Sequence, residues 1–332
     1  MYKIAKMSDT ERRIIFRNTA QKMGLNEAII EKDFWVCLTL DYLFHNCEWK
    51  DAFTFKGGTS LSKCYGLIKR FSEDIDLILD WRVLGYSVNE PWEERSNTKQ
   101  DQFNKEANSR AEIFLMEKLL PVLQKDLSVI IGNQADLYID EKDPQTICFR
   151  YPKIFQTESV LQMIRLEIGA LAAWTPAKRK IIKPYAAECY PKAFEKAEVE
   201  ILTAAAERTF WEKVTILHHE ANRPENLEMP SRYSRHYYDL YCIAHSENKE
   251  AAFQNLELLR RVVDFKMKFY PRKWAKYEEA IPGSIRLLPP EFRFTALEAD
   301  YLSMSEMIFG EYPPFEELME FIKHLETEIN TL

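Results

Sequence analysis

The pattern of hydrophobic and polar positions predicts two helices at the start of the chain. Residues 8–23 have an amphipathic pattern, opened by a capping pair of Ser8 and Glu11 and closed by a glycine. A second helix is expected from Asn26 to about His45, because apolar side chains recur there at helical spacing. The chain therefore starts with a helical pair.

A strand, a glycine turn, a helix and a second strand are expected next. Residues 53–55 and 75–79 are short apolar runs, typical of buried strands. Between them, Gly57 and Gly58 form a predicted turn, and residues 59–69 form a predicted helix. Only nine of the 332 residues are glycine, so this adjacent pair indicates a point where the backbone must be bare.

Further strands are expected in the region that follows. Residues 89–110 are rich in charge and indicate an irregular insert, followed by a helix over about 109–123. Residues 135–139 and 146–151 have the pattern of two strands, and 162–168 alternates like another. These segments extend the predicted sheet.

From residue 195 onward the pattern is helical, with few strand candidates. A chain of 332 residues is long enough for two domains. We expect a catalytic domain over residues 1–190 and a helical domain over 191–332. The predicted fold class is α+β (mixed α/β), with a small mixed sheet flanked by helices and a C-terminal helical lobe.

Composition indicates a globular protein that does not enter a membrane. Hydrophobic residues make up 46% of the chain, yet the longest apolar runs are far shorter than the ~18 residues of a membrane span. The six cysteines show no metal-ligand spacing, which favours reduced thiols and a cytoplasmic location.

The net charge of −7 argues against a generally cationic surface for nucleic acid. Basic clusters at 178–183 and 260–276 are nevertheless candidates for a local RNA-binding patch. Solvated helix faces are the simpler explanation of each cluster.

Two carboxylates one residue apart suggest a metal site. Asp74 and Asp76 enter the apolar strand over 75–79, and alternation along a strand points both to one face, roughly 6.6 to 6.8 Å apart at the Cα atoms. Carboxylates so placed can share two Mg²⁺ ions, the usual device for displacement at phosphorus. Taken alone, such a pair is as typical of a solvated edge strand.

The glycine turn adds a predicted phosphate site. Gly57 and Gly58 would let backbone N–H groups approach a triphosphate, and Thr59 or Ser60 would begin a helix whose N-terminus favours an anion. Lys63 is a further candidate for phosphate binding, although a solvated position is equally compatible with its place on the helix. The spacing around Lys63 is not that of a Walker loop.

These motifs resemble a known family, the AbiEii/AbiGii-type nucleotidyltransferase toxins of bacteria, in the polymerase-beta-like nucleotidyltransferase superfamily. The resemblance extends over nearly the whole chain. Its carriers are KGGTSLSK at 56–63, RFSEDIDL at 70–77, EKDFW at 31–35, FWEKV at 210–214, RHYYDLY at 235–241 and the segment from Asp300 to Phe315.

The resemblance implies a three-carboxylate metal site. Asp74 and Asp76 match the family's metal ligands, and Glu167 lies where the superfamily places a third carboxylate on a neighbouring strand. A glutamate reaches one methylene farther than the usual aspartate. An inward-pointing Glu167 could also help to deprotonate the acceptor hydroxyl. The alternative is a structural partner for Arg165 or a lysine.

The resemblance also implies roles in the helical half. Lys213 matches the family's motif lysine, which holds the triphosphate, and Asp239 matches a later aspartate that orients this lysine or the nucleotide. The neighbouring His218, His219 and Glu220 invite comparison with a zinc site. Adjacent histidines lie on different helix faces and no HExxH spacing follows, so this reading is disfavoured.

The implied activity is Mg²⁺-dependent transfer of NMP from an NTP to an acceptor, with RNA such as a tRNA 3′ end as the expected acceptor. The chain would then be the toxin of a type IV-like toxin–antitoxin or abortive-infection system, with an antitoxin partner. Two alternatives remain open. The acceptor could be a protein or a small molecule, or the scaffold could be a non-catalytic GTP-binding or partner-binding module.

Overall fold

A computed structural model of the chain describes residues 1–70, 72, 74–157, 160–172, 175–310 and 312–332. Two residues of the motif over 70–77, Phe71 and Glu73, lie outside the described residues. The chain divides into two compact units. Unit 1 comprises Met1–Cys64 and Ser72–Ala204, and unit 2 comprises Tyr65–Phe71 and Ala205–Leu332.

Unit 1 contains the sheet and the helices that pack on it. Its helices are α1 (Tyr2–Ala5), α2 (Asp9–Met23), α3 (Glu27–His45), α4 (Gly57–Lys63), α5 (Asn97–Phe114), α6 (Leu120–Ile131) and α7 (Tyr185–Cys189), with a π-helical segment, Leu115–Leu119, joining α5 to α6. Its strands are β1 (Phe53–Lys56), β2 (Ile75–Leu79), β3 (Asp136–Ile139), β4 (Thr146–Arg150), β5 (Ile164–Gly169), β6 (Ala177–Ile182) and β7 (Val199–Ala204).

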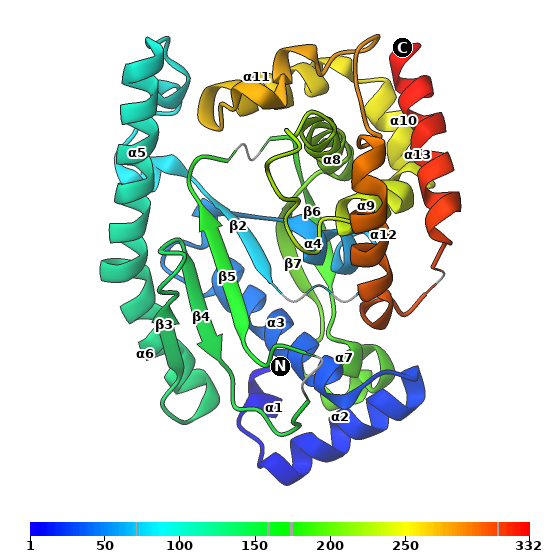
Figure 1. Ribbon diagram of the computed structural model, residues 1–332. Helices are drawn as coiled ribbons and strands as arrows, with labels where there is room; N and C mark the ends of the chain where they lie inside the picture. The colour runs from blue at the N-terminus through cyan, green and yellow to red at the C-terminus, as the bar shows by residue number, and fades with distance from the viewer. Residues whose placement is uncertain (71, 73, 158–159, 173–174, 311) are drawn as a thin grey trace. The chain divides into compact units, whose positions relative to one another are not determined.

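The seven described strands form one mixed sheet in the order β3-β4-β5-β2-β1-β7-β6 (Figure 1). β2 runs parallel to β5, and β1 runs parallel to β7. The other neighbouring pairs are antiparallel. The two strands expected to carry the carboxylates, β2 and β5, are therefore direct neighbours near the middle of the sheet. The mixed α/β fold class is confirmed.

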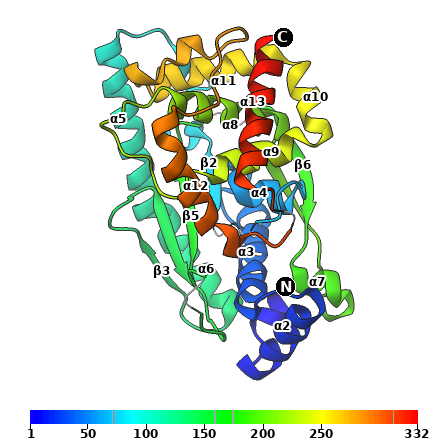
Figure 2. The ribbon, with the colours of Figure 1, turned by 45° about the vertical axis from the view of Figure 1, so that its right-hand side comes forward.

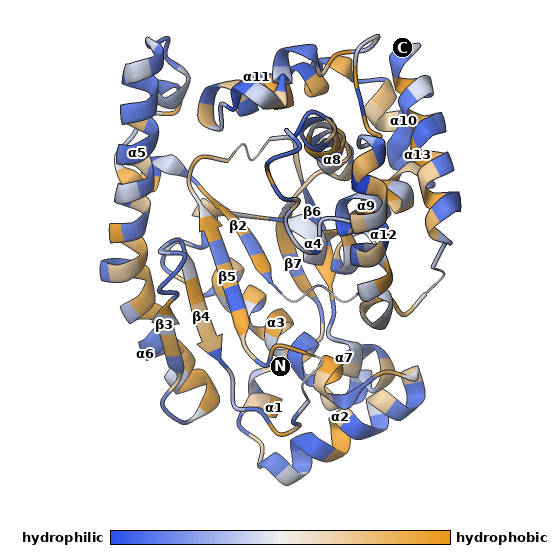
Figure 3. Cartoon of the chain, in the orientation of Figure 1, coloured by the Kyte–Doolittle hydropathy of each residue, from blue (hydrophilic) through white to orange (hydrophobic). Residues whose placement is uncertain are grey.

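Helix α3 is the main element that covers the sheet. Figure 3 shows hydrophobic positions on β3, β4, β5 and β7 and on α3, and α3 contacts both β5 and β7. Trp35 of α3 stacks on Tyr151 and meets Phe149 edge-on, with ring centroids 6.0 and 6.3 Å away. Figures 1 and 2 both show α2 beside α7, in agreement with their packing contacts.

Several predicted elements are present with nearly the expected bounds. The Ser8 side chain accepts from the Glu11 backbone N–H, and the Glu11 carboxylate accepts from Ser8, so the capping box opens α2 as expected. Asn26 caps α3, which ends at His45. The strand predicted over 75–79 is β2.

Other elements differ from the prediction. α4 begins at Gly57 and ends at Lys63, so the two glycines form its first turn and it is shorter than the expected helix over 59–69. Much of the segment expected to be irregular is α5, which begins at Asn97. Strands β6 and β7 are absent from the prediction, and β7 places the end of unit 1 at Ala204, beyond residue 190.

Unit 2 consists of helices around α8. Its helices are α8 (Ala206–Ala221), α9 (Arg235–Ala244), α10 (Glu247–Phe253), α11 (Leu256–Phe269), α12 (Phe294–Ser303) and α13 (Phe315–Asn330). α8 packs against α9, α10 and α11, and α13 packs against α9. Arg70 pairs with Ile308 in an isolated β-bridge, which ties the short early segment to this unit. Among the described residues, every helix is too short or too polar to cross a bilayer.

Candidate active site

Register in the sheet brings two of the predicted carboxylates together. Asp76 on β2 and Glu167 on β5 are Cα partners in the parallel pair. Directly paired residues of neighbouring strands share a face of the sheet. Asp74 lies two residues before Asp76, in front of the first residue of β2, and alternation gives it the same orientation. The sequence predicted three carboxylates, and the sheet gathers all three in one region.

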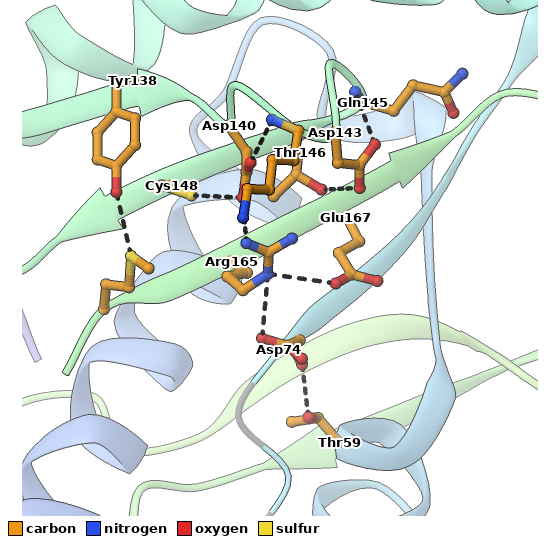
Figure 4. Close-up of polar contacts among 12 residues, drawn as sticks. Thr59, Asp74, Tyr138, Asp140, Asp143, Gln145, Thr146, Cys148, Arg165 and Glu167 are labelled. Atoms are coloured by element: carbon orange, nitrogen blue, oxygen red, sulfur yellow. Dashed lines mark hydrogen bonds and ion pairs between the residues drawn. The ribbon is translucent and has the colours of Figure 1, made fainter. Parts of the chain in front are cut away.

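Arg165 lies among these carboxylates. Figure 4 shows its guanidinium between Asp140, Glu167 and Asp74. The Nε atom is 3.5 Å from the Glu167 Oε1 atom and 4.0 Å from the Asp74 Oδ1 atom, and Nη1 donates to the Asp140 carboxylate. Arg165 is two residues before Glu167 on β5 and therefore lies on the same face. The Arg165 side chain thus forms ion pairs with three carboxylates.

The electrostatics of the cluster favour added positive charge. Burial raises the pKa of Glu167, and the neighbouring Asp76 carboxylate raises it further, whereas Arg165 opposes the shift. Like charges on adjacent strands disfavour full ionisation unless cations lie between them. A divalent cation would supply that charge.

The donor set suits Mg²⁺, which is held in proteins by a few carboxylates, with water and phosphate oxygens completing the shell. Asp74 and Glu167 already lie on either side of one cation, the Arg165 guanidinium. Within the described residues no three metal-binding side chains converge as a preformed cage. Asp74, Asp76 and Glu167 could therefore hold metal together with substrate oxygens.

Gly57 lies against the carboxylate cluster. Its φ is +80°, in the left-handed region, and a Cβ atom at this position would lie 1.9 Å from the Asp76 Oδ2 atom. A side chain at position 57 would therefore displace the Asp76 carboxylate. Gly58 follows as the second residue of α4. The bare backbone expected at the glycine pair is required at Gly57 by the proximity of Asp76.

The two hydroxyl residues after the glycines are engaged within the fold. Thr59 Oγ1 donates to the backbone oxygen of Asp74 at 2.6 Å, and Ser60 Oγ donates to the Gly57 oxygen at 2.9 Å. Both residues are buried. Thr59 therefore fixes the backbone at the entry to β2, where Asp74 begins the carboxylate pattern.

Lys63 points into the interior of unit 1. Its Nζ atom is 2.7 Å from the Asp33 Oδ1 atom and lies over the Tyr185 ring, 3.9 Å from the centroid. The side chains of Lys63 and Asp33 are only 7% and 4% exposed, so the solvated position considered from the sequence is wrong. Asp33 also accepts from the Tyr185 backbone N–H at 2.6 Å. This arrangement anchors α4 to α3.

Unit 2 contains the other predicted pair. The Lys213 Nζ atom on α8 is 2.7 Å from the Asp239 Oδ2 atom on α9, and it is 3.0 Å from the His236 Nδ1 atom. Arg70 donates to Asp239 through Nε and Nη2, at 2.7 and 2.9 Å. Asp239 therefore accepts from two cations at once. The resemblance implies that Asp239 orients Lys213 or the nucleotide, and in this structure Asp239 contacts Lys213 directly.

The charges of this cluster are set by burial and pairing. Burial opposes ionisation of Asp239, but Arg70 and Lys213 hold its pKa below the usual value. Burial lowers the pKa of Lys213, and Asp239 counteracts that shift. His236 is half-buried beside Lys213; the loss of hydration and the Lys213 charge both lower the pKa of its ring, which keeps the ring neutral. A neutral His236 can accept a hydrogen bond from the Lys213 ammonium group.

The chain matches a known family over most of its length. The family described as "Nucleotidyl transferase AbiEii toxin, Type IV TA system" matches residues 41–321. The chain belongs to the AbiEii family. This confirms the resemblance inferred from its motifs, and it makes the protein a nucleotidyltransferase, the toxin component of a type IV toxin–antitoxin system.

A solved structure agrees with this assignment. MenT4, a nucleotidyltransferase toxin from Mycobacterium tuberculosis, has 16% sequence identity to this AbiEii protein and a TM-score of 0.52. The match covers 96% of this chain and 89% of MenT4. At this identity the comparison establishes the shared fold. No curated protein matches the chain.

Little in the sequence indicated that some residues belong to the ion-pair clusters around Arg165, Asp239 and Lys63. Asp140 lies in the turn before β4, and its contact with Arg165 spans 25 residues. Arg70 lies 169 residues from Asp239, and Asp33 lies 30 residues from Lys63. Charge alone gives no pairing at such separations. The signal that was present is the motif context, because Asp33 and Arg70 both belong to segments that carry the family resemblance.

The histidine pair in α8 has structural contacts. His218 Nδ1 accepts from the Arg286 backbone N–H at 3.1 Å, and its Nε2 lies 3.0 Å from the Lys276 oxygen. His219 Nδ1 is 3.2 Å from the Tyr277 hydroxyl. These contacts engage both ring nitrogens of His218 and the Nδ1 atom of His219, and the described residues contain no cluster of three potential metal ligands.

The basic clusters are partly neutralised by neighbouring acids. The cluster at 178–183 lies on and just after β6, at one edge of the sheet, and the 260–276 cluster begins on α11. Exposed ion pairs of this kind contribute little to stability but reduce the local positive charge. The pairs are Arg179 with Glu200, Lys183 with Glu198, and Arg260 and Arg261 with Glu257.

Proposed function

We propose that this AbiEii family member is a Mg²⁺-dependent enzyme that transfers NMP from an NTP to an acceptor, with Asp74, Asp76 and Glu167 as the metal-binding carboxylates. The pairing of Asp76 with Glu167 across β2 and β5 is the observation that carries the proposal. Two bound Mg²⁺ ions would supply Lewis acidity at the transferred phosphoryl group and the leaving pyrophosphate.

Residues of the chain would have two roles in the reaction: removing the proton of the acceptor and aligning the reacting groups. An acceptor oxygen forms a bond to the α-phosphorus, the bond to pyrophosphate breaks, and the acceptor proton must be taken up. Glu167 is the proposed acceptor of that proton, because its carboxylate shares a face of the sheet with Asp76, its Cα partner on β2. Asp74 and Asp76 would hold the reacting groups in line.

Lys213 is the proposed triphosphate ligand in unit 2. Its contacts with Asp239 and His236 fix the position of the ammonium group, and a fixed cation loses little entropy on binding phosphate. The Gly57–Gly58 turn is the proposed backbone contact, with Thr59, Ser60 and Lys63 supporting the surrounding structure. In domain terms, residues 1–190 would supply the catalytic carboxylates and 191–332 would complete nucleotide and acceptor binding.

The proposed acceptor is RNA, such as a tRNA 3′ end, and an antitoxin is the proposed protein partner in the cytoplasm. The family assignment supports the antitoxin, and the RNA acceptor is carried over from the resemblance of the motifs. A cationic surface supports neither, since several basic residues are paired with acids. Transfer to a protein or a small molecule is the alternative within the same chemistry.

The experiment incubates the protein with α-³²P-labelled NTPs, Mg²⁺ and total cell extract. Label that is lost on RNase treatment and kept after protease treatment supports RNA as the acceptor. Label that is kept after RNase treatment and lost on protease treatment identifies a protein acceptor. Asp74→Asn and Asp76→Asn should each abolish transfer, as should EDTA. The matched control is Asp136→Asn, which changes an exposed aspartate paired with Arg150 on the same sheet. Full transfer by either active-site variant would overturn the proposed metal site.

A further inference from the structure

Arg165 is more buried and has more carboxylate partners than is usual for a surface arginine. Its side chain is 21% exposed, and it contacts carboxylates that come from three separate segments: Asp140 before β4, Glu167 on β5 and Asp74 before β2 (Figure 4). The contact with Asp140 is the shortest of the three. The Asp140 carboxylate is itself oriented by the Lys142 backbone N–H, which donates to Oδ1 at 2.8 Å.

We infer that Arg165 is the counter-cation of the carboxylate cluster when no metal is bound, and that it competes with divalent metal for Asp74 and Glu167. Asp140 binds the Arg165 guanidinium when metal takes its place. The inference rests on the metal site of the proposed function. Carboxylates on adjacent strands repel one another, so a nearby cation stabilises the cluster before metal arrives. The Arg165 guanidinium also repels an incoming metal ion. The guanidinium must therefore move away from Asp74 and Glu167, toward Asp140, when metal binds.

This arrangement predicts opposite effects for two substitutions. Arg165→Gln removes both the competitor and the repulsion, so divalent metal should bind more tightly. Asp140→Asn removes the charge that draws Arg165 away, so Arg165 should hold Asp74 and Glu167 more strongly and metal should bind more weakly. If Arg165 had only a structural role, the two substitutions would not change metal affinity in opposite directions, because each would disturb the site and weaken metal binding.

The experiment measures Mn²⁺ binding to the full chain without nucleotide, by titration calorimetry and by the electron paramagnetic resonance signal of free Mn²⁺. We expect the Mn²⁺ Kd to fall about five-fold in Arg165→Gln and to rise by a similar factor in Asp140→Asn. Arg165→Lys keeps the charge and should remain close to the unmodified protein. Arg150→Gln is the matched control, because it removes an arginine–aspartate pair, Arg150 with Asp136, from the same sheet.

Equal Kd values for the unmodified protein and Arg165→Gln would overturn the inference while leaving the metal site intact. Failure of the unmodified protein to bind Mn²⁺ would instead count against the proposed metal site. In that case thermal unfolding in EDTA decides the counter-cation role: Arg165→Gln should lower the midpoint, and adding Glu167→Gln should restore part of the loss. A double variant no more stable than Arg165→Gln would refute it.

Discussion

Gly57 lies so close to Asp76 that a Cβ atom at position 57 would fall 1.9 Å from the Asp76 Oδ2 atom. The glycine that opens α4 and the carboxylate in β2 therefore depend on each other. β1 and β2 are antiparallel neighbours, and their register places Lys56, the residue before Gly57, opposite Asp76. The space that a side chain would fill is occupied by the group proposed to bind metal.

Gly57→Ala should abolish nucleotidyl transfer. The alanine Cβ would push the Asp76 carboxylate out of place, and the left-handed φ of +80° would add about 1 kcal/mol or more of strain. Gly132→Ala is the matched control, because Gly132 has φ of +74° and nothing within 4 Å of the added Cβ. Gly57→Ala should lose at least as much stability as Gly132→Ala in chemical denaturation, and only Gly57→Ala should lose activity. Equal activity in the two would show that the contact with Asp76 is unimportant.

Glu31 should make stability depend on pH near neutrality. Burial raises its pKa to about 7, although the Ile154 and Phe155 backbone N–H groups donate to it and oppose the shift. The folded state therefore keeps a proton that the unfolded state loses near pH 4.5. The stabilising contribution is complete below pH 4.5 and is lost as the pH rises to about 7, with a total of roughly 3 kcal/mol at most.

Glu31→Gln removes this titration. Between pH 5 and pH 8, the unmodified protein should lose up to about 3 kcal/mol of unfolding free energy relative to the variant. Glu48→Gln, which changes an exposed glutamate in the same unit, is the control and should track the unmodified protein. Denaturant titrations at the two pH values make the measurement. Parallel pH profiles for Glu31→Gln and Glu48→Gln would contradict the prediction.

Asp239 and Lys213 should differ sharply in their effect on stability. Asp239→Asn leaves two buried cations, Lys213 and Arg70, without their carboxylate, which costs about 3 to 5 kcal/mol. Lys213→Met keeps the Arg70–Asp239 pair and should cost less, yet it should still abolish transfer because the proposed triphosphate ligand is gone. Unfolding midpoints and transfer assays are measured together. A larger loss of stability in Lys213→Met would overturn this ordering.

The Lys63–Asp33 pair should prove structural. Asp33→Asn would leave the Lys63 ammonium buried without its partner and should destabilise unit 1 by about 3 to 5 kcal/mol. The double variant Asp33→Leu with Lys63→Met removes both charges and should recover most of that loss. Transfer assays on the double variant then test phosphate binding: an unchanged KM for NTP supports a structural Lys63. A KM raised at least ten-fold in a folded double variant would assign Lys63 to the nucleotide.

The elements that could be predicted are those whose signal is local. α2 and α3 carry their own caps and apolar faces, and β2 is a compact apolar run. β6 escaped prediction because Lys178, Arg179 and Lys180 stand consecutively in an edge strand, where little burial is required of either face. Its identity as a strand depends on pairing with β7, which no local pattern records.

The candidate site divides in the same way. The amino-acid sequence by itself determined the glycine pair, the carboxylates at 74 and 76, and the family to which they belong, because each is a short motif. Only the tertiary structure decided that Glu167 pairs with Asp76, that Arg165 joins the cluster, and which partners hold Lys63 and Lys213. Strand register and buried ion pairs are set by the packing of segments far apart in the chain, and packing follows from the whole core rather than from any one motif.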